Sequence, residues 1–126
     1  MANILIVEDD ESVRTLAARA LENAGHMVVL AEDGERGLAR IGEAGGRFDL
    51  VVSDIRMPGM DGIEMAKAAS RRFPRLRILL VTGYADQRER AADLSGVVVD
   101  VLQKPFTLIE IRDRVASVLA SSSLTV

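Results

Sequence analysis

Five polar residues, each close behind a short apolar run, could do chemistry together. Two acids follow residues 4–7, an aspartate follows 50–52, a threonine follows 78–81 and a lysine follows 97–102; these are Glu8, Asp9, Asp54, Thr82 and Lys104. Apolar runs of this length, bounded by turn residues, are typical of strands buried on both faces. If the strands are parallel, their carboxyl ends lie at one edge of the sheet, and the five side chains lie there too.

Three clustered carboxylates repel one another, and a divalent cation relieves that repulsion. Because the set offers hard oxygen ligands without histidine or cysteine, it favours Mg²⁺. A carboxylate beside Mg²⁺ can attack phosphorus to form an aspartyl phosphate, and Asp54 is the candidate nucleophile. Lys104 would then bring positive charge, and Thr82 a hydroxyl hydrogen bond, to the phosphoryl oxygens.

Each of these residues also has an ordinary structural interpretation when taken alone. Asp54 could cap its loop through an Asx-turn, and the acids at 8–10 could favour a helix N-terminus. Thr82 could be a β-former, and Lys104 a solvated cation. Lys104 is out of pattern, because it is one of two lysines among 16 basic residues and it precedes Pro105. The joint placement of all these residues at one edge favours the chemical interpretation.

Alternating strand and helix patterns must position these side chains. Strands are predicted at residues 4–7, 27–31, 49–53, 78–81 and 97–102, and helices begin near residues 12, 33, 61, 85 and 107. Asp61 stands three residues before Glu64, and Thr107 three before Glu110, which are capping-box patterns. This alternation predicts an α/β fold, a doubly wound parallel five-stranded sheet with helices on both faces.

The bulk composition excludes several classes of function. The 126 residues suit one domain, predicted over 1–120 with a short tail at 121–126. Sixteen basic and nineteen acidic residues give a formal net charge of -3, so no broad basic surface is available for nucleic acid or for a membrane. The absence of cysteine excludes disulfides and thiolate sites.

Two further expectations concern the location of the protein and its histidine. No stretch reaches the roughly 20 apolar residues of a membrane span, and no basic leader precedes the first strand, so a cytoplasmic protein is expected. His26, the only histidine, follows Gly25 in a turn. We expect it to be exposed and not to be a ligand.

Four separated motifs, ILIVEDD, DIRMPGMDG, VTGYA and LQKPF, resemble the receiver domain of two-component response regulators in order and spacing. The resemblance covers residues 3–120 and implies a flavodoxin-like sheet of strand order 2-1-3-4-5. It implies that Asp54 is the phosphoacceptor, Thr82 the switch hydroxyl and Lys104, in a cis bond to Pro105, the phosphate-binding lysine. The implied Mg²⁺ set is Asp9 directly, Glu8 through a water, Asp54, and the backbone carbonyl of Arg56.

The switch residues depart from the family pattern. Many receivers carry a tyrosine or phenylalanine three residues before the lysine, where this sequence has Val101. Tyr84, two residues after Thr82, is one of four aromatic residues and is a candidate for the same gating role. Thr82, Tyr84 and Val101 are therefore the predicted switch residues.

The resemblance implies a signalling role rather than catalysis on other substrates. A histidine kinase or histidine phosphotransfer protein would phosphorylate the chain, which would catalyse only its own phosphorylation and dephosphorylation. We expect no output domain after the receiver, so the effect is expected to pass through a partner protein, with the chain a monomer or weak dimer. The runs ARALENAGH, MPGMDGIEMA and KPFTL resemble CpdR-like regulators, which control substrate delivery to the ClpXP protease.

Other functions remain open on the sequence. A free-standing receiver could relay phosphate to another phosphotransfer protein, and a pseudo-receiver could bind partners without chemistry. An aspartyl-nucleophile phosphohydrolase of the haloacid-dehalogenase kind needs a second aspartate where this chain has Arg56. A flavodoxin-like mononucleotide binder is disfavoured, because the acids after the first strand repel phosphate.

Overall fold

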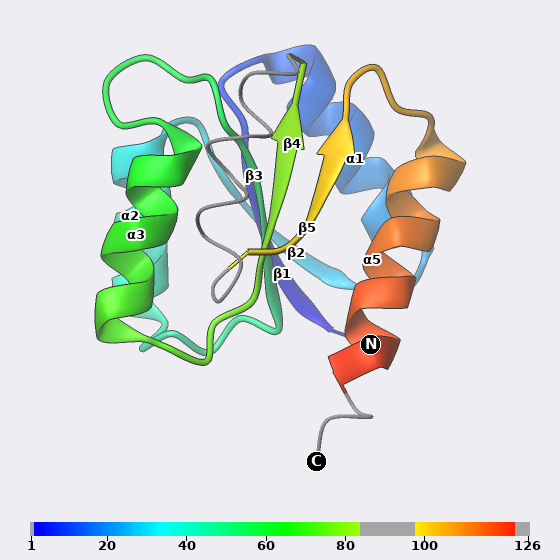
Figure 1. Cartoon of the computed structure of the whole chain (residues 1–126). Helices are drawn as coiled ribbons and strands as arrows, with labels where there is room; N and C mark the ends of the chain where they lie inside the picture. The colour runs from blue at the N-terminus through cyan, green and yellow to red at the C-terminus, as the bar shows by residue number, and fades with distance from the viewer. Residues whose placement is uncertain (1, 84–97, 123–126) are drawn as a thin grey trace.

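The computed structural model describes residues 2–83 and 98–122 and contains one five-stranded sheet. All neighbouring strands pair in parallel, in the order β2-β1-β3-β4-β5 (Figure 1). The strands are β1 (Asn3–Val7), β2 (Met27–Ala31), β3 (Leu50–Asp54), β4 (Ile78–Thr82) and β5 (Val98–Gln103). The predicted flavodoxin-like strand order, 2-1-3-4-5, is confirmed.

Four helices flank the sheet in the described part of the chain: α1 (Glu11–Asn23), α2 (Gly34–Glu43), α3 (Gly62–Arg72) and α5 (Leu108–Ser122). Helices α2 and α3 cover one face, and α1 and α5 cover the other (Figure 1). None of these helices is long and apolar enough to cross a bilayer. Three predictions lie outside the described residues: the helix that begins near residue 85, the switch residue Tyr84, and residues 123–126 of the tail.

The apolar core lies in two layers, one on each face of the sheet. Successive side chains of a strand point to opposite faces, so Leu5 and Val7 join the layer under α2 and α3 while Ile4 and Ile6 join the layer under α1 and α5. Every residue of β3 and β4 is buried. These two interior strands are therefore held from both faces, which explains their continuous apolar sequences.

Local signals fix where the helices begin. The Asp61 carboxylate accepts from the Glu64 N–H while Glu64 accepts from the Asp61 N–H, at 2.8 and 3.1 Å. Thr107 and Glu110 exchange the same two bonds, each at 3.1 Å. Both predicted capping boxes are thus present. Helix α1 begins one residue before the predicted start, because Asp10 caps it by accepting from the Val13 N–H.

Two sequence-based expectations were wrong. Asp54 was expected just beyond its strand, but it is the last residue of β3 and pairs with Val81, because the ladder continues to the hydrogen bond from the Ile55 N–H to the Val81 carbonyl.

His26 is half-buried instead of exposed. Its Nδ1 accepts a hydrogen bond from the Ala2 N–H at 3.2 Å, and burial lowers its pKa, which keeps the imidazole neutral and able to accept.

The start of α3 lies directly against the end of β3. A Cβ added to Gly62 would overlap the Asp54 carbonyl oxygen. That oxygen is already held by a hydrogen bond from the Ser53 hydroxyl at 2.9 Å, so it has little freedom to yield. Gly62 is therefore required by contact, although alanine is the better helix former.

Gly62→Ala should destabilise the fold by about 1–3 kcal/mol, the usual cost of overpacking a buried contact. Urea unfolding followed by circular dichroism measures the change. Gly83→Ala is the matched control, because nothing lies within 4 Å of a Cβ at Gly83. Unchanged stability in Gly62→Ala would contradict the packing argument.

Candidate functional site

The carboxyl edge of the sheet brings the predicted acids together. Glu8 and Asp9 follow β1, and Asp54 ends β3, which is the adjacent strand. Carboxylate oxygens of these three residues lie within 4.8 Å of one another. Within the described residues, this is the one group of three or more acids or histidines close enough to share a metal ion.

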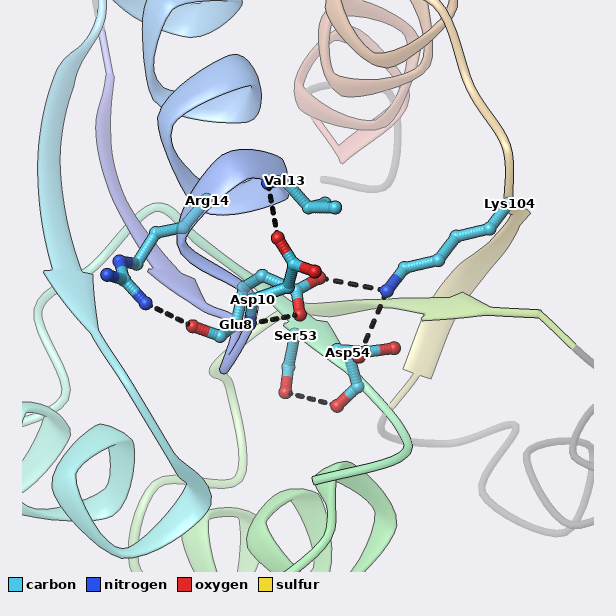
Figure 2. A network of polar contacts seen from close by, with 7 residues as sticks. All are labelled: Glu8, Asp10, Val13, Arg14, Ser53, Asp54 and Lys104. Carbon is cyan, nitrogen blue, oxygen red and sulfur yellow. Dashed lines mark hydrogen bonds and ion pairs between the residues drawn. The ribbon is translucent and has the colours of Figure 1, made fainter. Parts of the chain in front are cut away.

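Lys104 joins two of these acids. Its Nζ lies 3.0 Å from Asp54 Oδ2 and 3.0 Å from Glu8 Oε1 (Figure 2). The Glu8 and Asp54 residues are only 4% and 5% exposed, whereas the lysine side chain is 26% exposed. One half-buried ammonium therefore separates two nearly buried carboxylates.

Lys104 alone does not neutralise the negative charge of the three acids. Burial, followed by the negative charge of Asp54, raises the pKa of Glu8 to about 7, against the opposing effects of the Asp10 N–H and Lys104. Burial is the largest single effect on the Lys104 pKa and lowers it, but Asp54 and Glu8 together outweigh burial and raise that pKa. Lys104 thus stays positively charged, while the acids retain an excess of negative charge that a further cation would relieve.

Thr82 lies at the end of β4 and is completely buried. Its carbonyl accepts a hydrogen bond from the Lys104 N–H at 2.7 Å, next to the strand pair Thr82 and Gln103. The predicted hydroxyl residue and the predicted lysine are therefore linked through the main chain. The peptide bond from Lys104 to Pro105 is cis, as the family resemblance implied.

An open pocket of about 680 Å³ lies over the acidic group. Asp9 and Arg56, both exposed, line it together with Glu8, Asp54 and Lys104. Its other walls are mostly apolar and come from Val13, Leu16, Pro105 and Phe106. The pocket is thus bounded on one side by the start of α1 and on another by the loop after β5.

The predicted switch residues are only partly placed. Val101 is half-buried in β5 and packs against the core layer under α2 and α3. Its carbonyl accepts a hydrogen bond from Arg114 Nη1 at 3.0 Å. The switching roles of Val101, Thr82 and Tyr84 stay predictions.

The sequence reasoning missed two contacts to Glu8. The Asp10 N–H donates to Glu8 Oε2 at 3.1 Å, and Arg14 Nη1 donates to the Glu8 carbonyl at 2.9 Å (Figure 2). Arg14 lies one turn into α1, and a spacing of six residues across a strand-to-helix turn has no established sequence signal. The clue available was an arginine in the first turns of a helix whose start is acidic.

The donor set fits magnesium. All the clustered side chains offer carboxylate oxygens, and the one histidine of the sequence lies before β2, at the opposite edge of the sheet. Hard oxygen ligands in small number are the usual protein contribution to a Mg²⁺ site.

A five-stranded parallel sheet in this order occurs in flavodoxin-like proteins, and the acids and lysine at its carboxyl edge fit the receiver class of signalling domains. The chain matches the response regulator receiver domain over residues 4–116 and belongs to this family. Receiver domains are signalling modules that bind Mg²⁺ at an acidic site and interact with histidine kinases and downstream partners.

Individual relatives support the same assignment. The chain is 34% identical over 122 residues to the response regulator receiver protein CpdR of Brucella abortus, covering 97% of this chain and 100% of CpdR. It is 38% identical over 108 residues to the transcriptional regulatory protein TcrA of Mycobacterium tuberculosis, covering 86% of this chain and 42% of TcrA. The chain thus spans less than half the length of TcrA.

Among solved structures, the chain resembles the response regulator protein TrrA of Thermotoga maritima, which was solved in complex with Mg²⁺ and BeF. The TM-score is 0.81 at 32% identity, with 94% of this chain and 99% of TrrA covered.

Glu8→Gln should stabilise the metal-free protein at pH 8. The pKa of Glu8 is about 7 in the folded protein, against an ordinary value of 4.5. Between pH 4.5 and about pH 7, the folded chain therefore holds a proton that the unfolded chain has released. Wild-type stability therefore falls as the pH rises through this window, by on the order of 3 kcal/mol. Glutamine, being neutral, avoids this loss.

Urea unfolding in EDTA at pH 5 and pH 8 measures the effect, which should shrink towards pH 4.5. Glu11→Gln is the matched control, since Glu11 is an exposed acid in the first turn of α1 and its loss should not stabilise the protein. Equal stability of wild type and Glu8→Gln at pH 8 would show that the buried charge carries no cost.

Proposed function

We propose that the chain accepts a phosphoryl group on Asp54 and thereby switches its binding to a partner protein. The observation that carries this proposal is the set of contacts around Asp54, a nearly buried carboxylate with Lys104 Nζ at 3.0 Å and two more acids at its side. Such a carboxylate can act as a nucleophile when positive charge lies beside it.

The reaction is a transfer between a phosphodonor and Asp54. A bond forms between a carboxylate oxygen of Asp54 and phosphorus, while the bond from phosphorus to the donor breaks and the leaving group keeps the electron pair. For a histidine kinase or a histidine phosphotransfer protein, the leaving group is an imidazole nitrogen. No general base is needed, because phosphoryl transfer depends mainly on positioning and on neutralising the charge of the phosphoryl oxygens.

Glu8, Asp9, Asp54 and the backbone carbonyl of Arg56 would hold Mg²⁺. When bound, the ion supplies positive charge that offsets the carboxylates and the phosphoryl oxygens. Lys104 would then position the phosphoryl group. Its ammonium contacts the Asp54 carboxylate and lies within reach of a phosphoryl oxygen bonded there.

Thr82 would change its hydrogen bonding in response to the new charge and so affect neighbouring parts of the domain. Phosphorylation replaces the single negative charge of a carboxylate with a phosphoryl group that carries nearly two. The Thr82 hydroxyl can donate to a phosphoryl oxygen, and its carbonyl is bonded to the Lys104 N–H at 2.7 Å. A shift of either residue therefore affects the other, with Val101 and Tyr84 as the proposed switch residues further along the chain.

The site favours a switch over a phosphohydrolase that turns over small esters. The hydrolases considered above need a second aspartate two residues after the nucleophile, and this chain carries an exposed Arg56 there. The chain would catalyse only its own phosphorylation and dephosphorylation. It could also relay phosphate to another phosphotransfer protein, because the same aspartyl phosphate serves both purposes.

The proposed partners are a histidine kinase or histidine phosphotransfer protein upstream and another protein downstream. The similarity to CpdR over its whole length supports a CpdR-like role, in which the chain regulates proteolysis by ClpXP. We place this activity in the cytoplasm and propose that it needs neither nucleic acid nor a membrane.

Asp54→Asn should abolish phosphorylation. Incubation with ³²P-labelled acetyl phosphate and Mg²⁺ should label the wild type and leave this variant unlabelled, because the amide is no nucleophile. Asp49→Asn is the matched control, since Asp49 is an exposed carboxylate next to the opposite end of β3 and should leave labelling intact. EDTA should prevent labelling of the wild type, and persistent labelling of Asp54→Asn would refute the assignment.

The output partner can be tested with two states of the chain. Wild type carrying Mg²⁺ and beryllofluoride mimics the phosphorylated state, and Asp54→Ala cannot be modified. Purified ClpX should bind one state and not the other in a pull-down. Equal binding, or none to either state, would remove the ClpXP role and leave the phosphorylation proposal to be judged by labelling.

A further inference from the structure

Glu8 has every hydrogen-bonding group engaged. Its N–H donates to the Ala31 carbonyl at 3.0 Å, which continues the pairing of β1 with β2. Its carboxylate accepts from the Asp10 N–H and contacts Lys104 Nζ, at 3.1 and 3.0 Å. Its carbonyl accepts from Arg14 Nη1 at 2.9 Å. The carbonyl is thus the one group of Glu8 that is held by a side chain from α1.

This carbonyl lies beyond the reach of the sheet. The Glu8 N–H and carbonyl both face β2, whose pairing with β1 ends at Val7 and Ala31, so no strand supplies a donor to the Glu8 carbonyl. A buried carbonyl without a donor is costly, and Arg14 meets the need with a charge-assisted hydrogen bond. Within residues 2–83 and 98–122, the Arg14 guanidinium forms this hydrogen bond and no ion pair.

The placement of Arg14 relative to the acids is informative. Its guanidinium reaches the Glu8 carbonyl on one side, while Lys104 contacts the Glu8 carboxylate on the other (Figure 2). Glu8 is therefore held by two cations: Arg14 contacts its main chain and Lys104 contacts its side chain. The peptide that follows carries Asp9, whose carboxylate must converge on Asp54 against electrostatic repulsion.

We propose that Arg14 is a positioning residue for the acidic group. By holding the Glu8 carbonyl, it fixes the turn at 8–10 so that Glu8 and Asp9 present their carboxylates to Asp54. Without it, mutual repulsion would turn these carboxylates apart, and the site would have to be reassembled each time Mg²⁺ binds. The inference rests on the proposed function in taking Mg²⁺ as the ion held there.

The direction in which Mg²⁺ affinity changes when Arg14 is replaced distinguishes a positioning role from a purely electrostatic one. Arg14 is a cation near a site for another cation, so removing its charge should by Coulomb's law strengthen Mg²⁺ binding slightly. Removing a group that orients metal ligands instead weakens metal binding, typically by 10-fold or more. The two explanations of Arg14 therefore predict opposite changes in Mg²⁺ affinity.

Calorimetric titration of the unphosphorylated protein with Mg²⁺ tests the proposal. Arg14→Gln should weaken binding by roughly 10-fold. Arg14→Lys should recover much of the affinity, because lysine keeps a charged donor on a flexible stem. Arg19→Gln is the matched control, since it removes the same charge from an exposed position on α1 and should not weaken binding.

A second measurement does not depend on Mg²⁺. In metal-free protein, amide hydrogen exchange of Asp10, whose N–H donates to Glu8 Oε2, should become several-fold faster in Arg14→Gln and stay unchanged in Arg19→Gln. Circular dichroism should show that all variants are folded.

The outcomes separate this inference from the proposed function. If the wild type takes up no Mg²⁺, the proposed function fails, and exchange at Asp10 still decides whether Arg14 fixes the turn. If the wild type binds Mg²⁺ while Arg14→Gln binds it equally or more tightly, with unchanged exchange at Asp10, the positioning role is wrong and the proposed function stands.

Discussion

One ammonium between two nearly buried carboxylates is the interaction on which the site depends. Lys104 contacts Glu8 and Asp54 at the same distance of 3.0 Å, while Asp9 adds a third acid at the rim. Removing charged groups from water is costly, and a pair is retained only when its geometry compensates. The raised pKa of Glu8 indicates that compensation here is incomplete. The excess of negative charge would favour the binding of a further cation at this site.

The fold can hold this unfavourable group because its central strands cannot easily move. All residues of β3 and β4 are buried, and each strand packs against helices on both faces. Burying one large aliphatic side chain contributes roughly 1.5–3 kcal/mol, so a few such residues offset the cost of the clustered acids. Parallel pairing then places Asp54 beside the end of β1 and Thr82 beside the end of β5. Packing in the interior thus determines the electrostatics at the edge.

Sequence patterns predicted the features that depend on local signals. The parallel five-stranded sheet, the two capping boxes and the convergence of Glu8, Asp9 and Asp54 follow from apolar runs, turn residues and the rule that parallel strands share an edge. The family resemblance supplied the strand order and the individual roles, which composition and spacing could not.

The features that sequence patterns missed depend on contacts between side chains and distant main chain. His26 contacts Ala2, which is 24 residues away, and the pairing of Asp54 with Val81 is set by a neighbouring strand. Arg14 reaches back across a turn to a carbonyl, a contact that depends on the rotamer of a long side chain. No periodicity in the sequence carries such information. The departure at Val101 is visible in the sequence, but its meaning depends on how β5 packs.

At Gly62, the start of α3 lies so close to the Asp54 carbonyl that no methyl group fits between them. The helix therefore cannot approach the end of β3 any further. Under the proposed function, a change at the Asp54 side chain would therefore meet resistance on the α3 side. On the other side of Asp54 lie β4 and β5, where Thr82 and Lys104 are joined by a main-chain hydrogen bond.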